Sequence, residues 1–318
     1  MRKHKCMLAW VEEYVTYRRN LGFRFRTDRE QLLHFAKYVT DNRHRGPLTT
    51  DLALRWVQLA QDGSPSYRRR RFETVRSFAK YLAIYEPRTE IPPRGILRLA
   101  CHRPEPYIYS EQKIADLVRA CGELTPSGGL RPRTYSTLFA LLAATGLRVS
   151  EALKLDRNHV DLVQGVLTVR ETKFRKSRLV PFHPSIRQAL LQYADFRDCY
   201  HPIPKSGAFF LSESGRSLPY PTVSYVFQKL RQRLGWRCEN GRRHPRIHDL
   251  RHSFACRRIL SWYKEGKDVD RLIPFLSAYL GHAKVTDTYW YLTGIPELFA
   301  ITTERFEQYA QSKIGETP

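Results

Sequence analysis

Residues that can act on a phosphate group are gathered in one late stretch of the chain. His248-Asp-Leu-Arg251-His252 is followed by Leu280-Gly-His282 and by Thr288-Tyr-Trp-Tyr291, all within 44 residues. The planar guanidinium of arginine matches phosphate oxygens bidentately, and a tyrosine hydroxyl can become a covalent nucleophile. Two or more such groups converging on one point would suit a phosphodiester substrate.

A second arginine lies upstream, in Thr145-Gly-Leu-Arg148-Val-Ser-Glu151. Arg148 and Glu151 are three residues apart in a helix-forming stretch and therefore share a face. Glu151 could fix the arginine against a phosphate, although an ordinary surface ion pair explains the same spacing. His248 and Arg251 have the same separation, so both can point into one cleft.

Each remaining candidate also has a structural explanation. Gly281 can end a helix and bring His282 to a cleft, but a lone histidine is more often structural. Tyr289 and Tyr291 belong to an aromatic cluster of a kind that usually packs in a core. A zinc site needs ligand spacings that the chain lacks, so no metal is expected. The candidate ligands would be Cys238, His244, His248 and His252.

The composition points to a polyanionic partner. Lys and Arg number 54 against 31 Asp and Glu, which gives a formal charge of +23. Such an excess favours nucleic acid bound through its phosphates, with a ribosomal or membrane-surface protein as the alternative. The six cysteines are scattered without a CxxC pair, which indicates reduced thiols. The sequence contains no apolar run of about 18 residues, the length that a membrane span needs. We therefore expect a cytoplasmic, nucleoid-associated protein.

Helical periodicity and proline placement predict two domains. We expect an N-terminal helical domain over 1–86, a proline-rich linker over 87–106 and a second domain over 107–318. The second domain should contain a β-hairpin, with strands near 165–170 and 177–182 and its tip at 172–176. The helices are expected near 8–20, 27–41, 49–61, 65–84, 110–121, 132–145, 149–155, 184–196, 221–234, 247–263, 269–280 and 296–312.

The basic run in the fourth of these helices is a candidate DNA contact. Arg68, Arg69 and Arg71 belong to its opening turns. A charge run of this kind is more often a solvated face, but the basic composition of the whole chain favours DNA.

Three motifs together resemble the tyrosine recombinases of the phage integrase family. They are Ala144-Thr-Gly-Leu-Arg-Val-Ser-Glu-Ala-Leu-Lys-Leu155, His248-Asp-Leu-Arg-His252, and Leu280-Gly-His282 with Tyr291 nine residues later. The resemblance is close over about 107–300 and looser over the N-terminal helices. It implies a mainly α chain with a small β-sheet or hairpin. A helical, SAM-like core-binding domain and an α+β catalytic domain would form a C-shaped clamp on DNA.

The resemblance also implies residue roles. Arg148 and Arg251 would clamp the scissile phosphate, with Glu151 supporting the first of them. His248 and His282 would hydrogen-bond around the phosphate, and Tyr291 would be the nucleophile, with Tyr289 as a rival.

In the hairpin tip, Lys173 would protonate the leaving 5′-oxygen. The family often has glycine after this lysine, where this chain has Phe174. Arg175 and Lys176 are rival proton donors and candidate DNA contacts.

The implied activity is site-specific recombination. DNA strands would be cut and rejoined through a 3′-phosphotyrosyl intermediate and a Holliday junction, without a cofactor, in mobile-element integration, transposition or dimer resolution. A homo-tetramer would hold two DNA sites, a dimer on each, with possible accessory DNA-binding proteins and an exchange helix at 296–312. Relaxation of supercoils by a type IB topoisomerase-like enzyme, or DNA binding without catalysis, are the alternatives.

Overall fold

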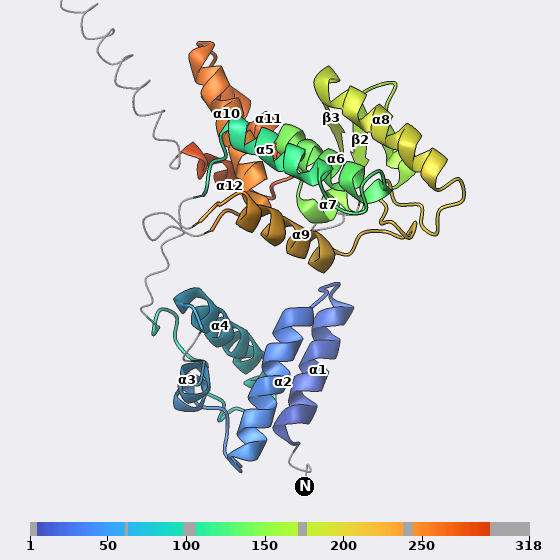
Figure 1. The fold of residues 1–318 in the computed structure, drawn as a ribbon. Coiled ribbons are helices and arrows are strands. Elements are labelled where there is room, and N and C mark those ends of the chain that lie inside the picture. Colours follow the sequence, from blue (N-terminus) through green and yellow to red (C-terminus); the bar gives the residue numbers. More distant parts are fainter. Residues whose placement is uncertain (1–4, 61–62, 98–105, 171–176, 238–243, 293–318) are drawn as a thin grey trace, which may run out of the picture. The chain divides into compact units, whose positions relative to one another are not determined.

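The chain folds as two units, each with its own apolar core. In the computed structural model, which describes residues 5–60, 63–97, 106–170, 177–237 and 244–292, the units are Met1–Arg103 and Pro104–Pro318 (Figure 1). The hairpin tip at 172–176, with Lys173, Arg175 and Lys176, and the expected helix at 296–312 lie outside the described residues. None of the described helices has the length and apolar content needed to cross a membrane.

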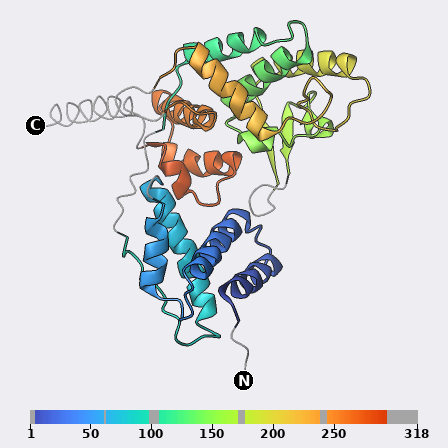
Figure 2. The same ribbon diagram turned by 60° about the horizontal axis from the view of Figure 1, so that its bottom comes forward.

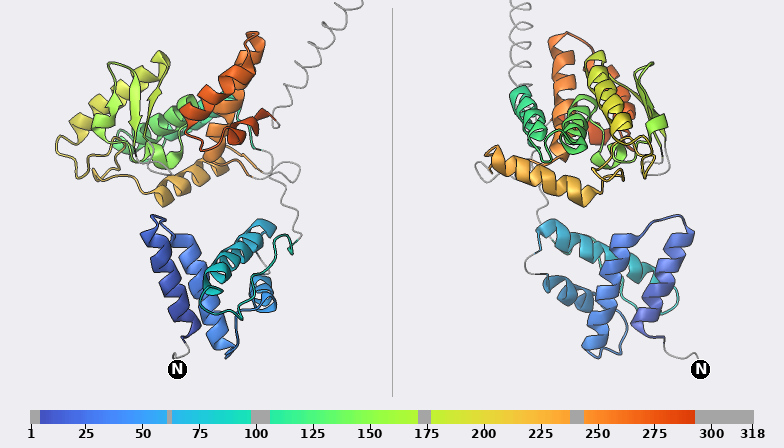
Figure 3. Two further views of the ribbon diagram at one scale, coloured as in Figure 1. Left: turned by 180° about the vertical axis from the view of Figure 1, so that it is seen from behind. Right: turned by 45° about the vertical axis from the view of Figure 1, so that its right-hand side comes forward.

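Over residues 5–60 and 63–97, the first unit folds into four helices, as its periodicity predicts (Figure 3). Thr49 accepts a hydrogen bond from the Leu52 amide, and Ser64 accepts one from the Tyr67 amide, so two of its helices have a side-chain cap at their N-terminus. The helices are α1 (Met7–Asn20), α2 (Arg26–Asp41), α3 (Thr50–Gln58) and α4 (Pro65–Leu82). Their apolar faces meet in one core, which includes Phe35, Trp56 and Phe78.

Residues after α4 that were expected in a linker pack on this first unit. The Glu90 amide donates to the Leu48 carbonyl at 2.8 Å, and Arg76 Nε donates to the Pro92 carbonyl at 2.7 Å. Leu97 packs against the first core. Residues 87–97 of the expected linker are therefore packed on the N-terminal helices.

The second unit is mainly helical, with one small sheet (Figure 1). Helix α6 is its central element, because it is buried on most sides and packs against α5, α8 and α10. The helices are α5 (Glu111–Gly122), α6 (Leu130–Thr145), α7 (Val149–Ala152), α8 (Pro184–Tyr200), α9 (Tyr220–Arg233), α10 (His248–Lys264), α11 (Val269–Leu280) and α12 (Thr286–Tyr289). Helices α10 and α11 lie side by side (Figure 2).

The sheet contains the expected hairpin and one strand more. Strands β2 (Val166–Val169) and β3 (Arg178–Pro181) pair antiparallel, and β1 (Val160–Asp161) pairs antiparallel with β2 (Figure 3). A 3-10 turn at Arg157–His159 precedes β1. The prediction of a mainly α chain with a small β-sheet is confirmed.

Candidate active site

Arg251 joins the carboxyl ends of two helices inside the second unit. It lies in the first turn of α10 and is 1% exposed. Its Nη1 donates to the Gly146 carbonyl, and its Nη2 donates to the Leu280 carbonyl, each at 2.8 Å. The last carbonyls of a helix lack intrahelical partners and carry partial negative charge, so a guanidinium is a suitable partner for both ends.

Burial and neighbouring charges act on Arg251 in opposite directions. Burial lowers the pKa of Arg251 to about 10, with a further lowering by Arg148, while Tyr291 raises it. The guanidinium is still charged at neutral pH. It is therefore a fixed positive charge beside the Tyr291 phenol.

Arg148, the residue before α7, reaches the same helix end. Its Nη1 donates to Glu151 Oε1 at 2.9 Å, and its backbone amide donates to Glu151 Oε2 at 3.1 Å. Both terminal nitrogens also approach the Gly281 carbonyl, at 3.4 and 3.3 Å. Arg148 and Arg251 therefore bind adjacent carbonyls of the turn that ends α11.

Arg178, the first residue of β3, is a third arginine at this helix end, and it belongs to none of the sequence motifs. Its Nη2 donates to Glu151 Oε2 at 2.8 Å, and its Nε donates to the Tyr279 carbonyl at 2.7 Å. The available sequence signal was weak: an arginine at the start of a predicted strand that is otherwise apolar.

His282 and Tyr291 are held next to each other by a single turn of helix. His282 Nδ1 lies 2.8 Å from the hydroxyl of Thr288, a fully buried residue of α12. The imidazole of His282 stacks on the Tyr291 ring, with centroids 5.9 Å apart and planes 27° apart. The nine-residue offset thus brings these two side chains together.

Tyr291 is 2% exposed and packs between histidines and an arginine. The His252 ring lies 5.4 Å from it. Burial raises the pKa of Tyr291 above its ordinary value of 10, and the charge and hydrogen bond of Arg251 counter this rise in part. A buried phenol of this kind is neutral at rest and depends on Arg251 for stabilisation of its anion.

The other sequence candidates have different surroundings. Tyr289 is 39% exposed on α12, in contrast to buried Tyr291. His248 begins α10 with an exposed side chain, and its ring lies 4.7 Å from the buried His252. In the part of the chain that the structure describes, no three His, Cys, Asp or Glu side chains form a group that could hold a metal ion.

The basic run on α4 is divided between solvent and the first core. Arg69 is exposed and Arg68 is half-buried. The guanidinium of Arg71 stacks 3.8 Å above the Trp56 ring and donates to the Trp56 carbonyl at 3.2 Å, and burial lowers the pKa of Arg71. Part of this run therefore packs within the unit.

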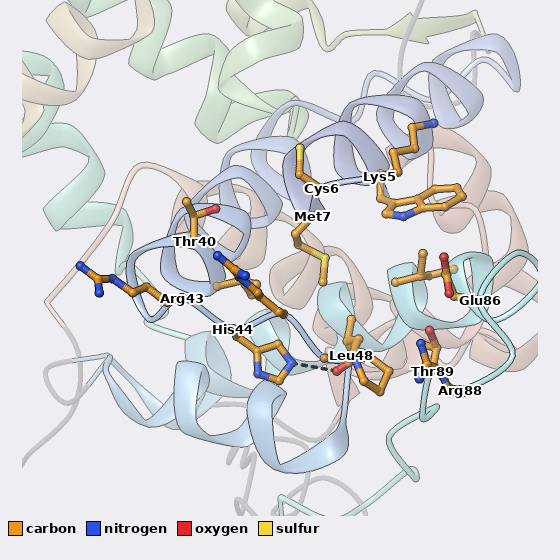
Figure 4. A pocket seen from close by; sticks show the side chains of 16 residues that line it. Lys5, Cys6, Met7, Thr40, Arg43, His44, Leu48, Glu86, Arg88 and Thr89 are labelled. Carbon is orange, nitrogen blue, oxygen red and sulfur yellow. Dashed lines mark hydrogen bonds between the residues drawn. The ribbon is translucent and has the colours of Figure 1, made fainter. Parts of the chain in front are cut away.

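A pocket of about 740 Å³ lies in the first unit (Figure 4). It is lined by residues of α1, α2 and the segments after α2 and α4, among them Met7, Arg43, His44 and Arg88. None of the predicted catalytic residues contributes to it.

We expect the free energy of unfolding to lose the contribution of Glu151 at low pH. Burial raises the pKa of Glu151, but hydrogen bonds and charge from Arg178, with hydrogen bonds from Arg148, outweigh it and leave the pKa below its ordinary value of 4.5. A carboxyl group whose pKa is lower in the folded state contributes its full stabilisation at a pH above its ordinary pKa. This contribution disappears as the pH falls through the folded-state pKa.

Denaturant unfolding of wild type and Glu151→Gln at several pH values measures this contribution. The difference between the two proteins should be largest above the ordinary pKa and should narrow at lower pH. A difference that is independent of pH would contradict the ionised, doubly paired carboxylate.

Comparisons with known proteins identify the family of this chain. Residues 110–294 match the phage integrase family. The chain is 40% identical over 304 residues to y4rB of Sinorhizobium fredii, whose name places it among integrases or recombinases, covering 94% of this chain and 96% of that protein. It is 30% identical over 268 residues to the tyrosine recombinase XerC of Bradyrhizobium diazoefficiens, covering 82% and 78%.

A solved structure has the same fold. The Tn1549 transposon integrase in complex with transposon right end DNA superposes with a TM-score of 0.70 at 16% identity, covering 96% of this chain and 100% of that one. The chain belongs to the phage integrase family. It is accordingly a tyrosine-type site-specific recombinase.

Proposed function

We propose that the protein cuts and rejoins DNA at specific sites through a 3′-phosphotyrosyl intermediate, with Tyr291 as the nucleophile. The observation that carries this proposal is the position of Tyr291, whose ring stacks on His282 and whose phenol lies near enough to Arg251 for that charge to lower its pKa. Arg148 binds the carbonyl next to the one that Arg251 binds. A phosphate at this turn would meet two guanidiniums and a phenol together.

The chemistry then follows from charge. The transition state of phosphodiester attack gathers negative charge on the non-bridging oxygens, which Arg148 and Arg251 stabilise as preorganised donors. The Tyr291 oxygen forms a bond to phosphorus while its proton passes to His248. The bond to the 5′-oxygen breaks, and Lys173 supplies the proton that this oxygen needs.

The bond energy is conserved in the phosphotyrosyl link. A 5′-hydroxyl of a second duplex can therefore attack it without a nucleotide cofactor, and one such exchange on each of two sites produces a Holliday junction. Because Tyr291 is 2% exposed, attack requires the segment that carries it to shift outward when DNA binds.

The assembly and the biological role are also part of this proposal. The domain over 1–86 would serve as the core-binding domain and 107–318 as the catalytic domain, joined by the linker at 87–106. Recombination would join two DNA sites within a homo-tetramer at the bacterial nucleoid, with the helix at 296–312 docked on a neighbouring protomer. The similarity to a transposon integrase and to y4rB favours mobility of a genetic element.

Labelled fragments of the DNA that flanks the gene test the activity. We expect covalent protein–DNA adducts that resist detergent, with a free 5′-hydroxyl on the released strand, and joined products when two sites are present. Relaxation of supercoiled plasmid without joined products would instead indicate a topoisomerase-like enzyme. Specific binding without adducts would indicate a DNA-binding protein without catalysis.

A further inference from the structure

Three consecutive carbonyls at the end of α11 are each bound by a different arginine. Arg178 Nε donates to the Tyr279 carbonyl at 2.7 Å, and Arg251 Nη2 donates to the Leu280 carbonyl at 2.8 Å. Arg148 approaches the Gly281 carbonyl at 3.3 Å. The arginines come from β3, from α10 and from the start of α7. The turn that leads into His282 is therefore fixed from three elements.

Arg178 is closely fitted to this turn. Gly281 has a φ of +69°, and a Cβ built on it would lie 2.7 Å from Arg178 Nη1. Glycine is needed here both for the backbone conformation and for the approach of the guanidinium. The Arg178 side chain is 13% exposed, so its position is set by these contacts.

One carboxylate is shared between two of the three arginines. Arg178 binds Glu151 through both terminal nitrogens, Nη1 to Oε1 at 3.2 Å and Nη2 to Oε2 at 2.8 Å. Arg148 binds the same carboxylate with one guanidinium nitrogen, at 2.9 Å. If Glu151 had Arg148 as its only partner, the pair would be neutral, and Arg148 would attract a phosphate less strongly. With Arg178 present, the group of three carries a net positive charge.

We propose that Arg178 is a positioning residue for strand cleavage, which balances the charge of Glu151 so that Glu151 can orient Arg148 without neutralising it. The proposal rests on the proposed function, because Arg148 is taken to bind the scissile phosphate. Arg178 itself need not touch DNA. Its effect should appear in the rate of the chemical step rather than in the affinity for a site.

A second substitution separates charge balance from simple packing. Arg178→Met leaves Glu151 with a full negative charge and Arg148 as its remaining cation partner. Adding Glu151→Gln removes that charge and keeps an oxygen that can accept from the Arg148 amide. If Arg178 only holds β3 in place, the second substitution should restore nothing.

The chain also offers a matched control. Arg197 on α8 is 3% exposed and donates to the carbonyls of Phe209 and Ala208, at 2.9 and 2.8 Å. Arg197→Met therefore removes a buried arginine with comparable carbonyl contacts from the same unit. It should lower the melting temperature without a specific effect on the chemistry.

The measurement is the single-turnover rate of covalent adduct formation by the full chain, at saturating amounts of the flanking-DNA fragment. We expect Arg178→Met to slow this rate about 30-fold, which is less than the roughly 10²–10³-fold loss of a donor that itself binds the phosphate, because Arg178 acts through Glu151 and Arg148. The change in Kd should stay below about 3-fold. Arg178→Lys should be intermediate, since it keeps the charge and loses the bidentate geometry. Arg178→Met/Glu151→Gln should be about 5-fold or more faster than Arg178→Met alone.

Two results would overturn the proposal. One is a rate for Arg178→Met that equals that of Arg197→Met after correction for the folded fraction. The other is a double variant no faster than Arg178→Met. If Arg178→Met does not fold, Arg178→Gln, which also removes the charge, and its double variant with Glu151→Gln decide by the same comparison.

Inorganic sulfate separates this proposal from the proposed function. A sulfate ion bound by Arg148 raises the melting temperature by mass action. The rise is measured at constant ionic strength in wild type and in Arg148→Met. The difference between the two rises is the part that is specific to the site. Arg178→Met should reduce that part, and Glu151→Gln in the same chain should restore it. If wild type forms no adducts, the proposed DNA cleavage is refuted, but the role of Arg178 is not. If the sulfate response of Arg178→Met equals that of wild type, the role of Arg178 is refuted.

Discussion

Tyr291→Phe should form no covalent adduct with DNA while binding the same fragment with unchanged affinity. The substitution removes the phenol oxygen near Arg251 and keeps the ring that stacks on His282. Without that oxygen no phosphotyrosyl bond can form, so the loss should be complete rather than partial. Denaturing gels of labelled DNA measure the adduct, and a gel-shift titration measures binding.

Tyr289→Phe is the matched control, because it makes the same change two residues away on an exposed ring. It should retain adduct formation at close to the wild-type rate. Adducts that persist in Tyr291→Phe and vanish in Tyr289→Phe would move the nucleophile to Tyr289. Loss of the buried hydroxyl should cost the fold about 1 kcal/mol, since Arg251 keeps its two carbonyl partners, so melting curves can exclude unfolding as the cause.

Long periodic elements and their caps were readable from the sequence. The end of a helix at Gly281 and the helix predicted near 65–84 each depend on near neighbours in the chain, and both are present. Short elements were not readable in this way. Helix α12 and strand β1 have too few residues for a period to show, and α7 ends at Ala152 after a single turn rather than continuing to 155.

The residues of the site show the same difference between local and distant sequence signals. Arg148, Glu151, His248, Arg251, His282 and Tyr291 were recognised because short motifs carry them. The structure brings Arg148, Arg251, His282 and Tyr291 to one helix end. Arg178 was missed because its partners Glu151 and Tyr279 are 27 and 101 residues away, and no local pattern records contacts at that distance.

The complete burial of Arg251 was equally invisible in a single sequence. An arginine in a basic chain is usually solvated, and only the carbonyls of Gly146 and Leu280 explain why this one is inside. Helices α6 and α11 are each followed by a glycine in the left-handed conformation, Gly146 and Gly281. Arg251 binds the carbonyl of Gly146 itself and, at the other helix, the carbonyl of Leu280, the residue before the glycine. The pairing therefore depends on how α6, α10 and α11 pack.

Arg251→Met should slow adduct formation by about 10²–10³-fold at saturating DNA, the scale seen when a preorganised donor is removed from an oxyanion site. The substitution removes the charge that favours the Tyr291 anion and one of the two guanidiniums proposed to hold the phosphate. Both effects act on the transition state, so the rate should fall much more than the affinity for DNA. Single-turnover adduct rates and gel-shift titrations with the same fragment separate the two quantities.

The same substitution on the outer face of α10 supplies the control. Arg258 is exposed, so Arg258→Met removes an equal charge from the same helix and should leave the adduct rate nearly unchanged. Methionine at 251 fills most of the buried volume but leaves the Gly146 and Leu280 carbonyls without their donor, at about 1–3 kcal/mol for each such group. Because the turn before His282 then loses one of its three arginines, stacking of His282 on Tyr291 should loosen as well. Equal adduct rates in the Arg251 and Arg258 variants, both folded by their melting curves, would mean that the buried guanidinium holds helix ends together and has no part in cleavage.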